Sequence, residues 1–176
     1  MDAKTTPEYL ISNALNMPDN DALSWKDSSG KWISSSWSDF YNCTMKMAKS
    51  LIALGFEPGD NLSIYSYNRM EWYAAYAAAN FCNGAAVGVY HTCSPEEVEW
   101  VVGNSDSKVV FVGTNPMDNG DPAKMCTKRL EKAMPSLEKV EAVVSMIGME
   151  SIDHPKAHDW DSFMSIGSEI SDDMVM

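Results

Sequence analysis

The histidines of this 176-residue chain have the spacing that most resembles a metal site. His154 and His158 lie four residues apart, which would bring two imidazole ligands to one face of a helix. The carboxylates close to them belong to Asp153, Asp159 and Asp161. Pro155 lies just inside the helix that this arrangement needs, and its neighbours are typical of a loop. We therefore favour a solvated polar loop over a metal site.

His91 follows directly after a predicted strand, at the end of an α/β sheet where ligands approach. A capping or packing role is the alternative that we favour. The sequence contains no G-x-S-x-G nucleophile motif, and neither a G-x-x-x-x-G-K-[ST] nor a G-x-G-x-x-G phosphate loop. The residues by themselves therefore assign no catalytic, cofactor-binding or metal-ligating side chain.

The cysteines are widely spaced and form no C-x-x-C pair; they are Cys43, Cys82, Cys93 and Cys126. We expect buried, inert thiols in a reducing compartment. The opening residues MDAKTTPEYL do not have the pattern of a secretory leader, and no apolar run reaches the roughly 18 residues of a membrane span. An intracellular location is expected, with the cytoplasm and the surface of an organelle membrane both left open.

Charge and composition limit the function classes. A net charge of −12, from 25 acidic and 13 basic residues, argues against a nucleic-acid surface, because phosphate binding needs clustered Lys and Arg. With 45% apolar residues the chain can bury one sizeable core, either as a single domain or as part of a larger one.

The elements begin with a predicted hairpin over residues 22–35, with Ser28-Ser29-Gly30 as its turn. Ser36 and Asp39 have the spacing of a helix start, and the apolar stripe that follows runs to Gly55. Further strands are predicted over residues 62–67, 85–90, 108–113 and 140–147. Further helices are predicted from about 69 to 82, over 95–104 and from 121 to about 134.

Local signals define these helices. Asn68 is expected to cap the alanine-rich helix that begins near Arg69 and that should pack on several sides. Ser94-Pro95-Glu96-Glu97 combines an N-cap serine, an N1 proline and an N3 glutamate, which is the strongest start signal in the chain. Asp121-Pro122 is expected to open the last helix. The strand over 85–90 is expected to be buried.

This alternation predicts an α/β fold: a mostly parallel sheet with helices on both faces, plus the small N-terminal hairpin. Residues 1–148 are predicted to form the α/β unit. Residues 149–176 are predicted to be a polar, linker-like tail, in which only Trp160–Ile166 suggests a short helical turn.

One long stretch resembles a known family. Residues 59–112, which open with G-D-N-L-S-I-Y-S-Y-N-R-M-E-W, resemble the N-terminal region of AMP-forming acyl-activating enzymes, the AMP-dependent synthetase/ligase family. The greatest similarity is to long-chain fatty acyl-CoA synthetases, including the bubblegum type. The upstream T-M-K-M-A-K-S-L-I-A-L-G-F-E-P-G-D and the later W-D-S-F-M-S-I-G fit the same pattern, so the resemblance covers most of residues 20–167.

The resemblance implies part of the large N-terminal domain of an adenylate-forming enzyme. In the intact family, a fatty acid reacts with ATP, assisted by Mg²⁺, to give an acyl-adenylate, and coenzyme A then takes the acyl group. The family's phosphate loop, Y-T-S-G-T-T-G-x-P-K-G, is absent here, as are its adenine, ribose and hinge motifs and its catalytic lysine. No catalytic, cofactor-binding or metal residue is therefore carried over, and no cofactor is expected within this chain.

Within that family, the segment from Pro58 to Trp72 corresponds to supporting wall. Its polar residues are interpreted as turn, cap and surface ion-pair residues; they are Asp60, Asn68, Arg69 and Glu71.

Two functions follow. The first is an N-terminal fragment of a long-chain fatty acid–CoA ligase that is inactive alone and packs on the rest of the enzyme, whose partners are fatty acid, ATP and CoA. The alternative is a stand-alone, non-catalytic α/β binding module. Neither binds nucleic acid nor spans a membrane. In both cases uncovered apolar surface is expected to make the isolated chain associate.

Overall fold

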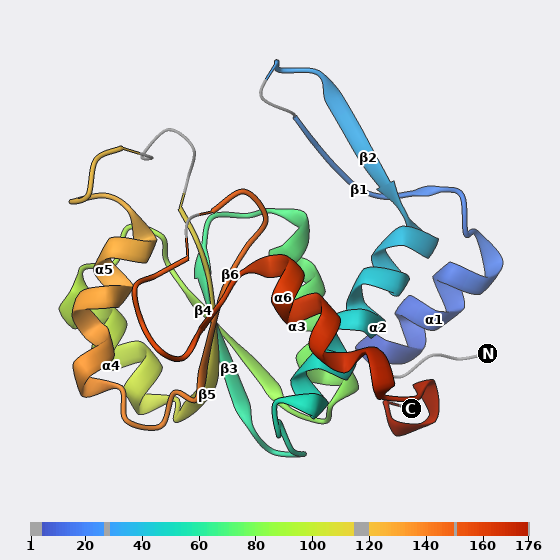
Figure 1. Ribbon diagram of the computed structural model, residues 1–176. Coiled ribbons are helices and arrows are strands. Elements are labelled where there is room, and N and C mark those ends of the chain that lie inside the picture. Colours follow the sequence, from blue (N-terminus) through green and yellow to red (C-terminus); the bar gives the residue numbers. More distant parts are fainter. Residues whose placement is uncertain (1–4, 27–28, 115–119, 150, 176) are drawn as a thin grey trace.

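A helix and a hairpin open the chain in the computed structural model, which describes residues 5–26, 29–114, 120–149 and 151–175. α1 (Thr6–Asn16) begins with a capping box between Thr5 and Glu8, a helix that the sequence analysis did not assign. β1 (Asp21–Lys26) and β2 (Trp32–Ser36) pair antiparallel, as predicted. The hairpin stands away from the body of the molecule (Figure 1). Ser28 of its predicted turn lies outside the described residues.

A parallel sheet forms the centre of the molecule, as predicted. Its strands, in spatial order, are β4 (Ala85–Val89), β3 (Asn61–Ser66), β5 (Ser107–Gly113), β6 (Ala142–Ser145) and β7 (Ala157–His158). Every neighbouring pair in this sheet is parallel. The chain passes from β3 to β4 on one side and then crosses to β5 on the other side of β3, so the topological switch point lies between β3 and β5.

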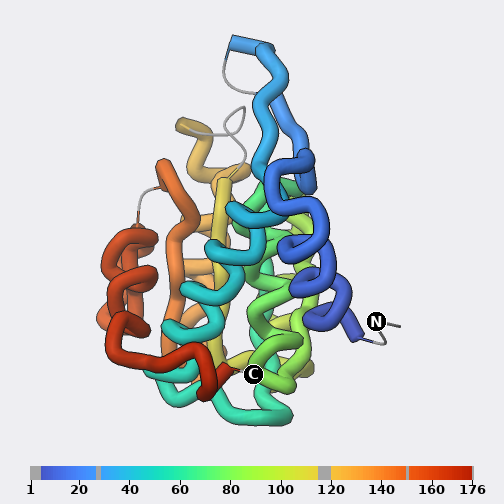
Figure 2. Tube along the Cα trace, turned by 90° about the vertical axis from the view of Figure 1, so that its right-hand side faces the viewer, coloured from blue at the N-terminus to red at the C-terminus, as the bar shows by residue number. Residues whose placement is uncertain are grey.

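Helices cover both faces of the sheet (Figure 1). α2 (Trp37–Ala53), α3 (Met70–Phe81) and α6 (Trp160–Ile166) lie on one face with α1, and Figure 2 shows α2 between α6 and α3. α4 (Pro95–Asn104) and α5 (Cys126–Ala133) cover the other face. The strands therefore bury apolar side chains on both sides: Ile64 and Phe111 pack toward α2 and α3, whereas Val110 and Val112 pack toward α4 and α5.

The predicted caps at Ser36 and Ser94 are confirmed. In each, the serine hydroxyl accepts a hydrogen bond from the N3 amide, and the N3 carboxylate accepts one from the serine amide. For Ser94 these distances are 3.3 Å from Glu97 N to Ser94 Oγ and 2.7 Å from Ser94 N to Glu97 Oε2.

Replacing Ser94 with alanine is expected to lower the free energy of unfolding by about 1 kcal/mol, because one amide of α4 loses its acceptor. Chemical denaturation measures this loss. Ser94→Asp supplies another good capping acceptor and is the matched control, expected to stay close to the parent. Equal stability of Ser94→Ala and the parent would contradict the assignment.

Two predicted helix starts are wrong. Arg69, and not Asn68, is the N-cap of α3, and no side chain caps this helix. α5 begins only at Cys126, and Asp121 instead begins a separate turn. In that turn the Asp121 carbonyl accepts from the amides of Lys124 and Met125, and its carboxylate accepts from the amide of Ala123.

Residues 85–89 do form the predicted strand, but the prediction that this strand is buried is wrong. β4 lies at the edge of the sheet, with Ala85 and Gly88 exposed and Val87 half-buried.

The alanine-rich α3 packs on several sides, as predicted, because it contacts α1, α2 and the sheet. Its buried alanines are Ala74, Ala75, Ala77, Ala78 and Ala79.

Residues after 148 pack against this core. The predicted helical turn is α6, whose Phe163 is fully buried with its ring centroid 5.3 Å from that of Phe111. Gly167 lies directly against the backbone of Lys49 and Ser50 in α2, and its amide donates to Ser50 Oγ at 3.3 Å. The division of the chain at residue 148 stays a prediction.

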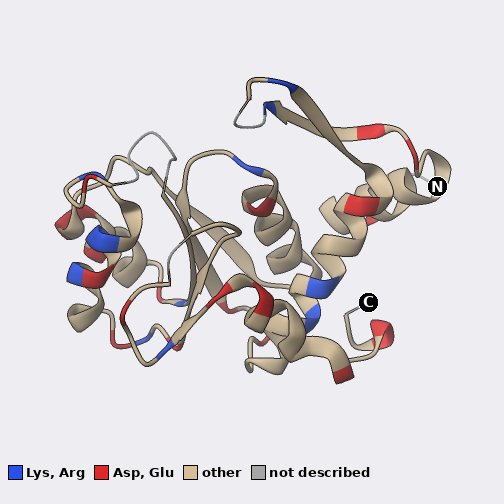
Figure 3. Ribbon diagram, turned by 45° about the horizontal axis from the view of Figure 1, so that its top comes forward, with Lys and Arg blue, Asp and Glu red and all other residues tan. Residues whose placement is uncertain are grey.

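Acidic residues are spread over the helices and loops and do not form one block along the chain (Figure 3). Several pair with nearby cations, as Asp60 does with Lys108 at 3.1 Å. Within the described ranges, none of the helices has both the length and the apolar composition that crossing a bilayer requires.

Candidate functional site

The carboxyl ends of β3 and β4 frame a groove of about 610 Å³. In open parallel sheets this is the edge at which ligands bind, because loops and helix starts meet there. The groove is lined by Ser66, Tyr67, Asn68, Trp72, Gly88, Val89, Tyr90 and His91. His91, which was predicted to follow a strand where ligands approach, therefore lies at this edge of the sheet.

Three side chains donate hydrogen bonds to backbone carbonyls of the loop that contains His91. Tyr65 Oη donates to the Cys93 carbonyl at 2.8 Å, and Arg129 Nη1 donates to the carbonyls of His91 and Cys93 at 3.3 and 3.1 Å. Cys126 Sγ donates to the His91 carbonyl at 3.5 Å. Burial raises the pKa of Tyr65 well above its usual value, so its hydroxyl remains a donor. These contacts give the groove a fixed wall.

Replacing Arg129 with alanine is expected to destabilise the fold by about 1.5–3 kcal/mol, because hydrogen bonds from a charged donor to three carbonyls are lost. Hydrogen exchange of the backbone amides in residues 90–94 should be faster in Arg129→Ala than in the parent. Lys132→Ala, an exposed cation on the same helix, is the control and should leave both unchanged. Unaltered exchange in Arg129→Ala would show that the loop does not depend on this residue.

Arg69 and Glu71, expected to be a surface ion pair, form a pair in which Glu71 is buried and Arg69 is half-buried. Their side chains are 13% and 7% exposed, and Arg69 Nε donates to Glu71 Oε2 at 2.8 Å. Arg69 Nη2 also donates to the Ile147 carbonyl at 2.8 Å, and the guanidinium lies 5.6 Å from the Tyr67 ring centroid. The pair therefore ties the start of α3 to the segment after β6, which is a structural role.

The groove does not contain an activated nucleophile. Ser66 Oγ is buried and has no hydrogen-bond partner among the residues that the structure describes, so no imidazole is positioned to accept its proton.

Asp60 lies at the opposite end of β3. Its carboxylate accepts from the Glu57 amide at 2.7 Å and pairs with Lys108, which is the turn role expected for it.

The candidate metal ligands are separated by their local structure. His154 Nδ1 accepts from the Lys156 amide at 3.2 Å, His158 lies in β7, and Asp159 caps α6 by accepting from the Ser162 amide at 2.8 Å. The four-residue spacing therefore falls on a turn and a strand instead of a helix. Within the described part of the chain, no group of three or more His, Cys, Asp or Glu side chains is arranged to hold a metal ion.

The cysteines are free thiols, as predicted. Burial raises the pKa of Cys43 to about 11 and that of Cys82 to about 12, and it also raises the pKa of Cys93. Thiolate is the reactive form, so these side chains are poor nucleophiles at neutral pH.

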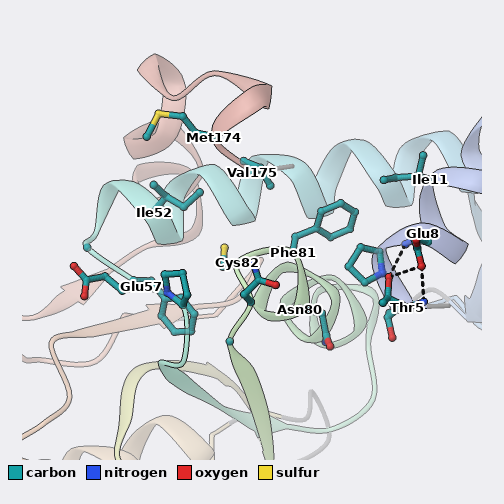
Figure 4. A pocket seen from close by; sticks show the side chains of 17 residues that line it. Thr5, Glu8, Ile11, Ile52, Glu57, Asn80, Phe81, Cys82, Met174 and Val175 are labelled. Atoms are coloured by element: carbon teal, nitrogen blue, oxygen red, sulfur yellow. Dashed lines mark hydrogen bonds between the residues drawn. The ribbon is translucent and has the colours of Figure 1, made fainter. Parts of the chain in front are cut away.

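A second groove, of about 1090 Å³, lies at the amino end of the sheet. It is formed by the start of α1, the ends of α2 and α3, and residues 174–175 (Figure 4). Glu8 and Thr5, joined by their capping hydrogen bonds, lie at one end of it, and Glu57 lies at the other. The described residues that line it include no Lys, Arg or His. Sequence reasoning had no signal for this groove, because separate segments build it.

Two solved structures share this architecture. An acetoacetyl-CoA synthetase from Streptomyces lividans superposes with a TM-score of 0.78 at 20% identity, over 91% of this chain and 25% of that one. A coronafacic acid ligase from Pectobacterium brasiliense superposes with a TM-score of 0.74 at 18% identity, over 96% of this chain and 31% of that one. This chain therefore has the fold of part of each of these two enzymes.

The family is shown by the sequence. The model of the AMP-binding enzyme family matches residues 11–168, so the chain belongs to this family. It is 27% identical to the long-chain-fatty-acid–CoA ligase ACSBG2 of Gallus gallus, over 98% of this chain and 21% of that protein. It is also 27% identical to the long chain acyl-CoA synthetase 1 of Arabidopsis thaliana, over 96% of this chain and 26% of that protein. The chain thus spans about a fifth to a quarter of the length of these relatives.

Proposed function

We propose that this chain is the N-terminal scaffold of a long-chain fatty acid–CoA ligase and that the 176 residues alone do not adenylate a fatty acid. The observation that carries the proposal is the extent of the match to the ligase of Gallus gallus: almost the whole of this chain corresponds to about a fifth of that enzyme. The parallel sheet, its two helical layers and the fixed loop at its carboxyl edge are the parts that support a neighbouring site.

The intact enzyme would use ATP, Mg²⁺ and CoA together with a fatty acid. The described residues do not fit the triphosphate or the metal by themselves. Arg69, the cation at the carboxyl edge of β3, already donates to Glu71 and to the Ile147 carbonyl. Carboxylates near the sheet, such as Asp60 and Asp159, are engaged by a lysine or a helix cap. We therefore assign positioning and support to this chain and no chemical step.

Packing on the rest of the enzyme follows from the same proposal. The carboxyl-edge groove and the exposed hairpin are the surfaces that further sequence would meet, since the helices already cover both faces of the sheet. No observation favours the stand-alone binding module over this account.

Sequencing of the transcript past codon 176 tests the proposal. We expect an open reading frame that continues into a loop of the form Y-T-S-G-T-T-G-x-P-K-G. A stop codon directly after codon 176, together with accumulation of the 176-residue protein in cells, would contradict it.

A further inference from the structure

Among the described residues, no strand pairs with the outer edge of β4. β4 pairs with β3 on one side only and is the terminal strand of the sheet as described. Its residues are accessible, with Ala85 and Gly88 exposed and Ala86 and Val87 half-buried. The other terminal strand, β7, is two residues long and is followed by Asp159. One edge is therefore short and bounded by charge, whereas the other presents a full strand.

β4 lacks the features that normally protect such an edge. Natural edge strands carry lysine, proline or a bulge that prevents pairing with another chain. The register of β4 with β3 is regular, and its sequence Ala-Ala-Val-Gly-Val contains neither charge nor proline. From Trp72 to Pro95 the sequence has no Asp, Glu, Lys or Arg, although 22% of the chain is charged. The uncharged stretch includes β4, most of α3 and the loop after β4.

Exposed aromatic rings lie beside this edge. A methyl group at Gly88 would lie 3.4 Å from Trp72 Cζ2, so the indole lies over β4. Tyr76 stacks on Trp72 with centroids 6.2 Å apart, and Tyr73 meets it edge-on at 5.4 Å. Tyr73 and Tyr76 are 38% and 39% exposed, and Tyr90 at the strand end is 81% exposed. Aromatic side chains of this kind are enriched at protein interfaces.

We propose that β4 pairs with β4 of a second copy of this chain, antiparallel and about a two-fold axis at Val87. Two-fold symmetry requires identical surfaces to meet, and antiparallel strands satisfy this when each residue faces its symmetric counterpart. Ala85 then lies opposite Val89, and Ala86 opposite Gly88, which are small or apolar pairs without charge. Elsewhere the net charge of −12 makes two copies repel, so the uncharged edge is where they can approach.

The pairing is expected to be weak and reversible. Two short strands bury less surface than a stable interface needs, so the flanking aromatic side chains must supply the rest. The inference concerns association of the 176-residue chain and does not depend on the proposed ligase function.

Sedimentation equilibrium measures the proposed association. We expect the mass of the parent to rise reversibly toward that of a dimer as concentration increases. Ala85→Lys places a charge on the edge and is expected to stay monomeric. Ser168→Lys makes the same charge change at an exposed site on the 3₁₀ turn that packs on α2, and should behave as the parent. A parent that stays monomeric, or a folded Ala85→Lys that associates like the parent, would overturn the proposal.

A cross-linking variant tests the register even if Ala85→Lys fails to fold. Residues directly opposed in antiparallel strands have Cα atoms about 4.5–5.5 Å apart, which a disulfide spans. Val87→Cys should therefore form a covalent dimer on mild oxidation, and the parent and Ser168→Cys should not. No cross-link in Val87→Cys, or equal cross-linking in all three proteins, would overturn the pairing of β4.

Discussion

Replacing Arg69 with methionine is expected to lower the free energy of unfolding by about 3–5 kcal/mol, because the buried Glu71 carboxylate loses its cation. The Glu71 side chain is only 7% exposed, so water cannot replace the guanidinium. The Ile147 carbonyl loses its donor as well, which frees the segment after β6. Urea denaturation followed by circular dichroism measures the loss.

The double variant Arg69→Met/Glu71→Met is the control for this prediction. It removes both charges, and a buried ion pair replaced by apolar side chains of similar size costs little. We expect the double variant to recover most of the stability that Arg69→Met loses. Glu71→Met completes the cycle: if the losses of Arg69→Met and Glu71→Met simply add up to that of the double variant, the two side chains are not coupled, which would contradict the structural role of the pair.

Replacing Phe163 with alanine is expected to cost about 3–5 kcal/mol, because the ring is fully buried between α6 and the sheet. Removing it leaves a cavity beside Phe111 and Trp160. Thermal and urea unfolding of the variant should shift together, as one cooperative transition.

Ser168→Ala, two residues beyond α6 and exposed, is the matched control and should remain within about 0.5 kcal/mol of the parent. The comparison decides whether residues 149–175 belong to the cooperative unit. A Phe163→Ala protein as stable as the parent would mean that this segment behaves as the linker that its composition suggested.

Local signals predicted much of the fold. Ser36 with Asp39, and Ser94 with Glu97, mark two helix starts because capping depends on residues three apart. The same signal was present at Thr5 and Glu8, with Pro7 between them, and could have identified α1. Alternation of apolar strands with helices was enough to predict the parallel sheet.

Features that depend on distant segments could not be predicted in this way. β4 is as apolar as the central strands, and only the spatial order of the sheet puts it at an edge. Arg69 and Glu71 are two residues apart and look like surface charges, yet the Glu71 side chain is buried and Arg69 donates to the carbonyl of Ile147, far away in the sequence. Phe163 likewise finds its partner in Phe111, far away in the sequence.

In the candidate site, too, local sequence signals predicted one part and contacts between distant segments determine the rest. Sequence placed His91 at the end of a strand, and the fold puts it in a groove. The contacts that hold its loop come from Tyr65, Cys126 and Arg129, on other elements, and no local motif announces them. The interpretation of residues 58–72 as a supporting wall stays a prediction; within that segment Asp60 and Arg69 have ion-pair partners, whereas Asn68 is exposed in the groove.

The central claim is that this chain supports a nucleotide site without containing one, and the direct test is fatty-acid-dependent exchange of labelled pyrophosphate into ATP. Adenylation needs preorganised donors around the phosphates, each contributing several kcal/mol. The sequence has no phosphate loop and no lysine after Lys156. With a full-length long-chain fatty acid–CoA ligase as positive control, we expect the purified 176-residue chain to give background exchange only. Exchange clearly above background, from protein free of host synthetase, would contradict the claim and reveal a nucleotide site within these residues.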